Sequence, residues 1–129
     1  MTPVDQQYLA GNAEGIPGDC VRACVASILD LALADVPHFV AANDAYWAGA
    51  LDDWCDNRGI ELIHLEGHFA FNFPVMLSGA SPRSGRHAVV GQGGGVLHDP
   101  HPSRDGLVGL ADRTWLFYPA RMNWREYAG

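Results

Sequence analysis

Residues 15–29 read Gly-Ile-Pro-Gly-Asp-Cys-Val-Arg-Ala-Cys-Val-Ala-Ser-Ile-Leu, a glycine–proline loop that leads into an apolar run. Asp19 is a suitable N-cap, so the pattern predicts a helix from about Cys20 to Leu31 with a wide buried stripe. Only Arg22 and Asp30 carry charge within it, and we therefore expect the helix to be central. Cys20 would then lie at the positive end of the helix macrodipole, which favours the thiolate over the thiol.

The rest of the chain places helices first and strands afterwards. A second helix is predicted from about Asp44 to Arg58, ending at Gly59, after a segment at Asp35–Phe39 that is read as a break or as one short helical turn. Strand patterns follow at 60–65, 74–78, 87–91, 96–99 and 114–118. This order predicts an α+β fold with a mostly antiparallel sheet, in one domain that spans residues 1–129. The tail after Pro119, which contains Trp124 and Tyr127, is expected to fold back on the body.

Composition limits the classes of function. The chain has 129 residues, 48% hydrophobic and 18% charged, which is typical of one globular domain. A net charge of −7 argues against binding to nucleic acid or to anionic lipid. No secretory signal or membrane-spanning run is visible, and three cysteines fit reduced thiols better than a disulfide framework. We therefore expect a cytoplasmic protein, and no cofactor is predicted.

A glycine-rich hairpin brings a histidine and an aspartate together. The segment 89–97 contains Gly93, Gly94 and Gly95 at its turn, where positive φ angles are needed. If Gly93 is the midpoint, His87 pairs directly with Asp99, and their Cβ atoms lie about 5 Å apart on one face. A slip of one residue would send the two side chains to opposite faces.

Thiol, imidazole and carboxylate, in this chain order, suggest nucleophilic catalysis. Cys20 would attack a carbonyl and form a thioester, His87 would act as general base and then acid, and Asp99 would hold the imidazole in its productive tautomer. The oxyanion needs donors. The backbone N–H of Cys20 is one candidate, and the other is a side-chain amide from the N-terminal arm, for which Gln6, Gln7 and Asn12 are available.

These residues resemble the papain-like cysteine peptidases, and within them the small bacterial and phage-type domains of the peptidase C39-like group. The matching elements are 18–24 (Gly-Asp-Cys-Val-Arg-Ala-Cys), 87–90 (His-Ala-Val-Val), Asp99-Pro100 and 4–6 (Val-Asp-Gln). The resemblance implies Cys20 as nucleophile, Cys24 as a second, non-catalytic cysteine, and Gln6 as the oxyanion glutamine. It also implies a helix bearing the cysteine packed on an antiparallel sheet that bears the histidine and the acid. Val21 stands where the group usually has glycine.

The functional hypothesis is a thiol hydrolase that cleaves an amide, peptide or isopeptide bond, with a peptide or protein as substrate. The same thioester would also serve an acyltransferase. The rival from another class is an inactive papain-like binding protein of phage or bacterial origin, because so small a domain has little room for a deep cleft. An active Cys20 thiolate should react quickly with iodoacetamide near pH 6.

Simpler interpretations compete with each assignment. Cys20 could be a buried core thiol, which is the usual interpretation of Cys24 and Cys55. His98 and His101 flank Asp99 and could hold a metal with Cys20, although no Cys-x-x-Cys or His-Glu-x-x-His element accompanies them. Arg83 and Arg86 could bind an acidic substrate, or be solvated loop charges. The tryptophans at 47, 54 and 115 are expected in the core.

Overall fold

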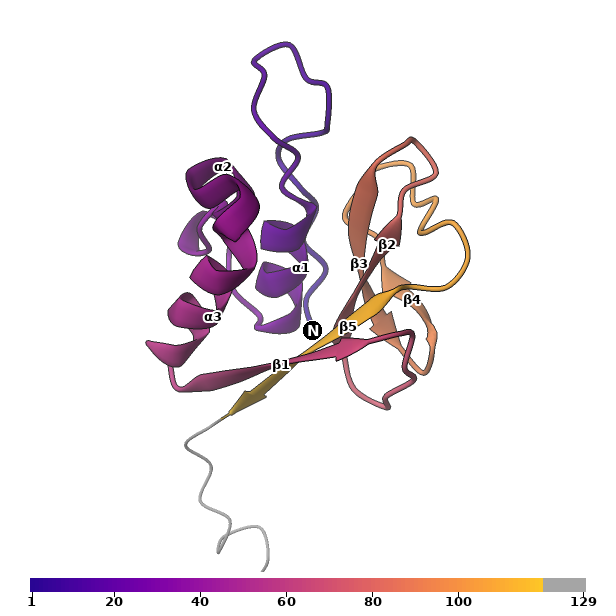
Figure 1. Ribbon diagram of the computed structural model, residues 1–129. Helices are drawn as coiled ribbons and strands as arrows, with labels where there is room; N and C mark the ends of the chain where they lie inside the picture. Colours follow the sequence, from indigo (N-terminus) through magenta and orange to yellow (C-terminus); the bar gives the residue numbers. More distant parts are fainter. Residues whose placement is uncertain (120–129) are drawn as a thin grey trace, which may run out of the picture.

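The computed structural model describes residues 1–119 (Figure 1). Three helices come first: α1 Cys20–Ile28, α2 Phe39–Asn43 and α3 Trp47–Asp56, with single 3-10 turns at Leu33–Asp35 and Asp44–Tyr46. Five strands follow: β1 Ile60–Glu66, β2 Val75–Ala80, β3 Arg86–Gln92, β4 Gly95–His98 and β5 Arg113–Pro119. The α+β class and all five predicted strands are confirmed. Trp124 and Tyr127 lie outside the described residues.

The helix α1 ends at Ile28, three residues before the predicted end at Leu31. Asp30 adopts a left-handed φ of 56°, and the Leu31 N–H bonds back to the Ala26 carbonyl at 2.9 Å. This is the hydrogen-bond pattern of a Schellman motif, which ends a helix by using its last carbonyls.

The region between α1 and the sheet differs from the prediction in two places. The predicted break contains the start of a short helix, α2, whose first residue Phe39 is buried. The predicted second helix begins as a 3-10 turn at Asp44, becomes α3 only at Trp47, and ends at Asp56. On the inner face of α3, Leu51 and Cys55 are fully buried.

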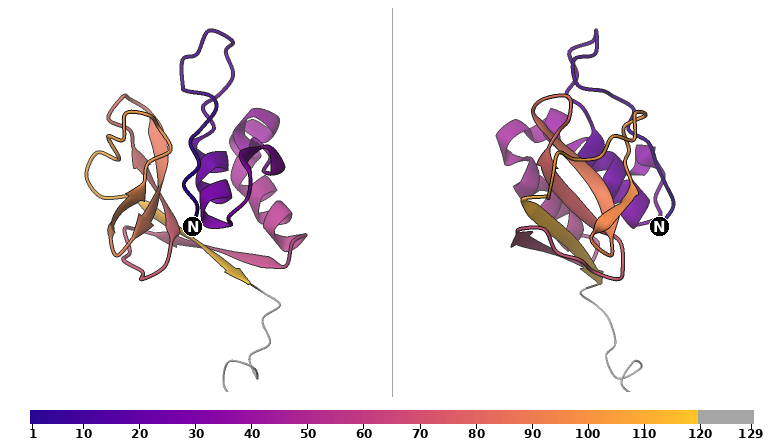
Figure 2. Two further views of the ribbon diagram at one scale, coloured as in Figure 1. Left: turned by 180° about the vertical axis from the view of Figure 1, so that it is seen from behind. Right: turned by 90° about the vertical axis from the view of Figure 1, so that its right-hand side faces the viewer.

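The sheet has the order β1-β5-β2-β3-β4, and every neighbouring pair is antiparallel. The last strand, β5, therefore lies between the first two. The helices lie together on one side of the sheet, with α1 against β2 and β3 and α3 against β1 (Figures 1 and 2). The core between them includes Val25, Leu51, Met76, Val90 and Trp115. A smaller apolar cluster covers the other face.

The register of the β3–β4 hairpin differs from the prediction. Gln92 pairs with Gly95, so the turn consists of Gly93 and Gly94, with φ angles of 65° and 84°. This shifts the register by one residue. A bulge between Val90 and Gly91 shifts it by one more, so that Val90 pairs with His98. The direct pairing of His87 with Asp99 was therefore wrong, but two shifts restore the original faces and leave the two residues diagonal on one face.

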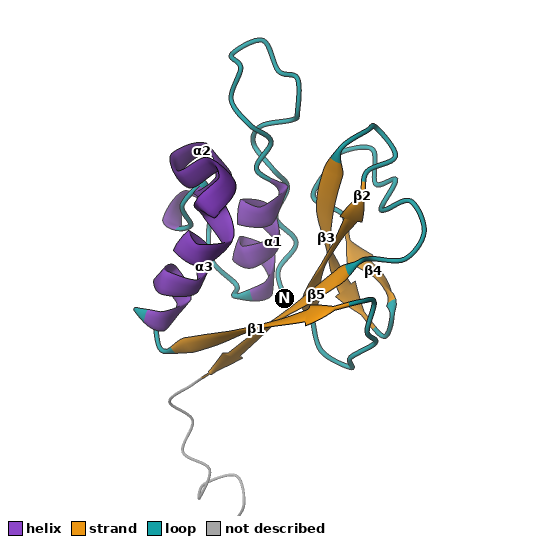
Figure 3. Cartoon of the chain, in the orientation of Figure 1, coloured by secondary structure: helices purple, strands orange, loops and turns teal. Residues whose placement is uncertain are grey.

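The N-terminal arm joins the helices to the sheet. On the helix side, the Val4 N–H donates to the Ser27 hydroxyl at 2.9 Å. On the sheet side, the Gln6 N–H donates to the Pro100 carbonyl at 3.1 Å, and Asp5 binds both terminal nitrogens of Arg104. Beyond Tyr8 the chain forms a long loop that projects past the helices before it enters α1 (Figure 3).

No single helix among residues 1–119 has the length and apolar character needed to cross a bilayer; only α1 taken together with the following helical segment, bent by 102°, would pass on length and composition.

Candidate active site

Cys20 is the first residue of α1 and is partly buried. The turn before it is fixed by Asp19, whose side chain is fully buried. The Tyr8 N–H donates to Asp19 Oδ1 at 2.8 Å, and the Asp19 N–H donates to the Tyr8 carbonyl at 3.2 Å. Asp19 occupies the N-cap position as predicted, but its side chain accepts no capping hydrogen bond from a main-chain N–H of the helix. It holds the arm instead, and thereby fixes where the helix begins.

His38 supports the same loop from α2. Its Nε2 lies 2.7 Å from the Pro17 carbonyl oxygen, and its Nδ1 accepts the Ala41 N–H at 3.3 Å. Because Nδ1 is an acceptor, Nε2 carries the proton and donates to Pro17. The loop that precedes Cys20 is therefore tied to both the arm and α2.

The expected preference of Cys20 for the thiolate is wrong for the free protein. Burial raises the pKa of the Cys20 thiol, and the Asp19 carboxylate adds to the rise. The backbone N–H groups of Ala88 and Val21 lower the pKa only in part. The position at a helix start does favour the anion, but the desolvation under β3 outweighs it. The thiol is therefore neutral at rest.

His87 and Asp99 form a buried pair. The distance from His87 Nε2 to Asp99 Oδ1 is 2.7 Å, and the two residues are 6% and 3% exposed. Asp99 also accepts the His101 N–H on Oδ1 at 2.9 Å and the Gly106 N–H on Oδ2 at 2.7 Å. Burial alone would raise the pKa of Asp99, but these three hydrogen bonds outweigh it and lower the pKa. The carboxylate is ionised and accepts only, so His87 Nε2 carries the proton and Nδ1 has the free lone pair.

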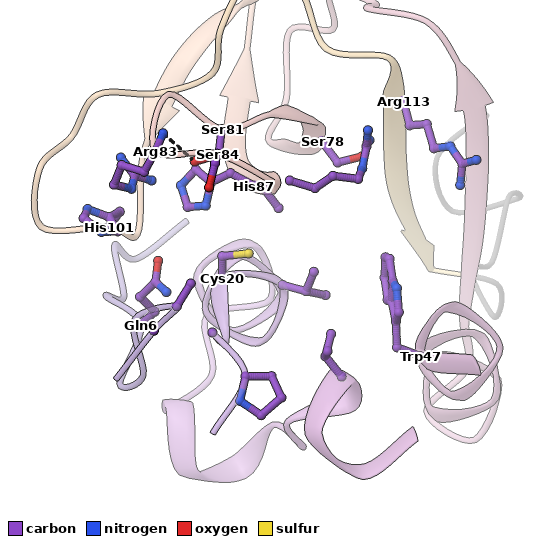
Figure 4. Close-up of a pocket in the computed structure, with 18 of the residues that line it drawn as sticks. Gln6, Cys20, Trp47, Ser78, Ser81, Arg83, Ser84, His87, His101 and Arg113 are labelled. Atoms are coloured by element: carbon purple, nitrogen blue, oxygen red, sulfur yellow. Dashed lines mark hydrogen bonds between the residues drawn. The ribbon is translucent and has the colours of Figure 1, made fainter. Parts of the chain in front are cut away.

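Cys20 and His87 line one cavity of about 820 Å³. Figure 4 shows the Cys20 sulfur on the helix side and the His87 ring on the sheet side of this space. The backbone of Ala88, the residue after His87, is close enough to Cys20 to lower the pKa of its thiol in part. A volume of this size is in the range of small-molecule and peptide sites. The expectation that the domain is too small for a substantial cleft was therefore wrong.

The three candidate oxyanion amides have different places. Gln6 lines the cavity, and its Nε2 donates to the Tyr8 carbonyl at 2.7 Å, while its Oε1 is buried without a hydrogen-bond partner. Gln7 is exposed and contacts the Tyr8 hydroxyl and Arg22. Asn12 is used within the projecting loop, where it binds the Leu9 and Ile16 carbonyls. Of the three, only Gln6 lines the same cavity as Cys20, and its Nε2 lies beside Gly18, two residues before Cys20.

The other two cysteines are packing residues. Cys24 is fully buried one turn along α1, and burial raises its pKa well above the usual value. Cys55 is fully buried in α3, and burial together with the charges of Asp52 and Asp56 raises its pKa to about 12. Both thiols are therefore less reactive than an accessible cysteine.

The histidines around Asp99 point to separate partners. His98 Nε2 lies 3.0 Å from the Val4 carbonyl oxygen and 3.2 Å from Asp5, in the N-terminal arm. His101 lines the cavity and bonds to Ser103. Among residues 1–119, no three His, Cys, Asp or Glu side chains are grouped as metal ligands would be.

The structure adds site residues that the sequence analysis did not assign. The His101 ring meets the His87 ring edge-on, with centroids 6.1 Å apart. Trp47 and Trp115, expected in the core, also line the cavity, as does Arg113. The His-Asp-Pro-His sequence at 98–101 was a signal for His101, but it was interpreted as a possible metal site.

Comparisons with known proteins give no match: no family model, no curated protein and no solved structure is similar to this chain.

Proposed function

We propose that the protein is a papain-like thiol hydrolase that cleaves an amide, peptide or isopeptide bond through Cys20, His87 and Asp99. The observation that carries the proposal is the buried 2.7 Å bond between His87 and Asp99, which faces the same cavity as the thiol at the start of α1. An ionised carboxylate behind a histidine is the arrangement that keeps one imidazole nitrogen basic.

The reaction would start from a neutral thiol. His87 Nδ1 takes the proton from Cys20 as the sulfur attacks the substrate carbonyl, and the ionised Asp99 stabilises the imidazolium. The imidazolium then gives this proton to the leaving amine, which departs and leaves a thioester on Cys20. Water, deprotonated by His87 Nδ1, attacks the thioester and releases the acid and the free thiol.

The oxyanion of each tetrahedral intermediate would be bound at the start of α1. The backbone N–H of Cys20 belongs to the first turn, where N–H groups have no partner within the helix. Gln6 Nε2 uses one hydrogen for the Tyr8 carbonyl and has a second hydrogen for the oxyanion. The binding site would therefore combine one main-chain donor and one side-chain donor.

Two other functions use the same residues. An acyltransferase would form the same thioester and pass it to an amine or alcohol in place of water. A catalytically inactive binding protein is favoured by one observation, the raised pKa of Cys20, which would keep the thiol inert if His87 did not assist it. The three free cysteines favour a reducing compartment, and we place the protein in the cytoplasm.

Alkylation by iodoacetamide, followed by mass spectrometry of each cysteine, separates the enzyme from the binding protein. We expect Cys20 to react much faster than Cys24 and Cys55 at neutral pH, and the rate to fall by about 10²-fold in His87→Gln because the base is lost. The matched control is His64→Gln, an exposed histidine on β1 that is not among the residues lining the cavity and whose ring stacks on Trp115. Since burial raises the pKa of Cys20, the rate should increase with pH, and this replaces the expectation that Cys20 already reacts quickly near pH 6.

Equal and slow alkylation of all three cysteines, unchanged in His87→Gln, would contradict the proposal and favour the binding protein. If Cys20 is activated, a screen of peptide, ubiquitin-like and cell-wall amides with added amine acceptors separates hydrolysis from acyl transfer by the product released.

A further inference from the structure

The charges along the cavity differ from those of the whole chain. The protein has a net charge of −7, and its eight basic residues are all arginines. Three of them, Arg83, Arg86 and Arg113, line the cavity, whereas Asp112 is the one carboxylate among the residues that line it. A cleft lined by one sign of charge attracts ligands of the opposite sign, even on a protein of the same sign as the ligand. The cavity is therefore a positive site on an acidic protein.

Two of the three guanidinium groups keep donors for a ligand. Arg86 is occupied, because its two terminal nitrogens bind Asp112 at 2.8 and 2.5 Å. Arg83 makes one hydrogen bond, to the Ser103 hydroxyl at 3.0 Å, and a looser contact with Asp105 at 3.8 Å. The side chain of Arg113 is exposed and makes no hydrogen bond or salt bridge within residues 1–119, although its charge helps to lower the pKa of Asp112. Arg83 and Arg113 therefore retain most of their binding capacity.

These two arginines lie on either side of the reactive groups. Figure 4 shows Arg83 beside His87 and His101, and Arg113 on the opposite side, toward Trp47. Both belong to the sheet wall of the cavity, because Arg83 is in the β2–β3 loop and Arg113 begins β5. A peptide bound across the cavity over Cys20 would pass both Arg83 and Arg113.

We infer that the cleft takes an acidic peptide, with carboxylate side chains on both sides of the bond that Cys20 attacks. The inference rests on the proposed function for the position of that bond, but the recognition itself does not need the chemistry. Guanidinium groups bind carboxylates through parallel N–H bonds, and this geometry selects a carboxylate over a neutral amide. The hydroxyls of Ser81 and Ser84, which also line the cavity, add donors next to Arg83.

Binding to an inactive variant tests the inference. Cys20→Ser is titrated with fluorescein-labelled octaglutamate, octaglutamine and octalysine, and with a labelled single-stranded oligonucleotide, by fluorescence anisotropy at two salt concentrations. We expect octaglutamate to bind at least tenfold more tightly than octaglutamine, and added salt to weaken it. Arg83→Gln and Arg113→Gln, each added to Cys20→Ser, should weaken it about three- to tenfold.

The matched control is Arg58→Gln, because Arg58 is an exposed arginine stacked on Trp54, away from the cavity. Equal affinity for octaglutamate and octaglutamine, an equal loss in Arg58→Gln, or tighter binding of the oligonucleotide would overturn the inference. Selective binding of octaglutamate in a protein whose Cys20 shows no activation would support it and overturn the proposed hydrolase, so the two results are independent.

Discussion

The two walls of the cleft each contain one buried carboxylate, and the two differ in what they bind. Asp19 and Asp99 are the only buried acidic residues among residues 1–119. Asp19, on the helix wall, accepts a main-chain N–H from the arm and has a long contact of 3.5 Å with Arg22. Asp99, on the sheet wall, accepts two main-chain N–H groups and also the imidazole of His87.

The different partners of Asp19 and Asp99 lead us to expect different main roles, one in folding stability and one in the reactivity of Cys20. Both carboxylates organise a loop, because a buried acceptor fixes the backbone groups that bind it. Only Asp99 also controls a proton on another side chain. Loss of Asp19 should therefore affect folding first, and loss of Asp99 should affect reactivity first.

The largest effect is expected from Asp99→Asn. The amide oxygen can accept from only one of the two main-chain N–H groups, those of His101 and Gly106, and the side chain no longer stabilises the imidazolium or fixes the proton on Nε2 of His87. In Ser-His-Asp triads the equivalent change lowers kcat by about 10⁴-fold, and we expect a loss of similar order in turnover of a peptide substrate. Urea unfolding measured in parallel should show a much smaller change. Loss of folding with normal reactivity in the folded fraction would show that Asp99 is only structural.

The next effect is expected from Asp19→Ala. Removal of the carboxylate leaves the Tyr8 N–H buried without its acceptor, which costs about 1–3 kcal/mol in the free energy of unfolding. Urea denaturation measures this loss, and Asp19→Asn is the matched control, because its amide oxygen can still accept the N–H. In the folded fraction, alkylation of Cys20 should still depend on His87. A variant of normal stability whose Cys20 had lost that dependence would reverse the assigned roles of the two aspartates.

The smallest effect is expected in the loss of folding stability at low pH. Since the folded-state pKa of Asp99 lies below its ordinary value of 3.8, the folded protein binds fewer protons than the unfolded chain in that range. Its contribution to stability is complete above the unfolded pKa and is lost as the pH falls through the folded pKa. Asp99→Asn should therefore show a shallower decline in unfolding free energy below about pH 5. The control is Asp112→Asn, which removes an exposed carboxylate paired with Arg86 and should change the pH dependence of the unfolding free energy less. Identical changes in the two variants would mean that the burial of Asp99 adds nothing to the pH dependence of stability.

The strands and the start of α1 could be predicted because local patterns decide them. Short apolar runs separated by turn residues mark β1 to β5, and the glycine–proline loop before Asp19 marks where α1 begins. The α2 helix was not predicted beyond one helical turn at 35–39, because its N-terminal hydrogen bond is donated by the Ala41 N–H to His38 Nδ1, whereas capping rules look for Ser, Thr, Asp or Asn.

The hairpin and the thiol show where local rules fail. Gly93, Gly94 and Gly95 all tolerate positive φ, so their sequence does not say which two form the turn. The bulge shifts the register a second time near the end of β4. At that point His98 contacts the N-terminal arm and Asp99 contacts Gly106. The state of Cys20 depends on its burial beneath β3, which the helix macrodipole argument does not include.

The N-terminal arm crosses from one wall of the cleft to the other, so the width of the cleft depends on main-chain contacts of the arm as well as on the side chains that line the cavity. The Val4 N–H donates a hydrogen bond to Ser27 in α1, while the Gln6 N–H donates one to the carbonyl of Pro100, the residue directly after Asp99. A tag or fusion partner that pulls on the arm would change the distance between Cys20 and His87, and a protease cut near residue 5 would remove the link that the arm makes between the two walls while leaving Cys20, His87 and Asp99 intact.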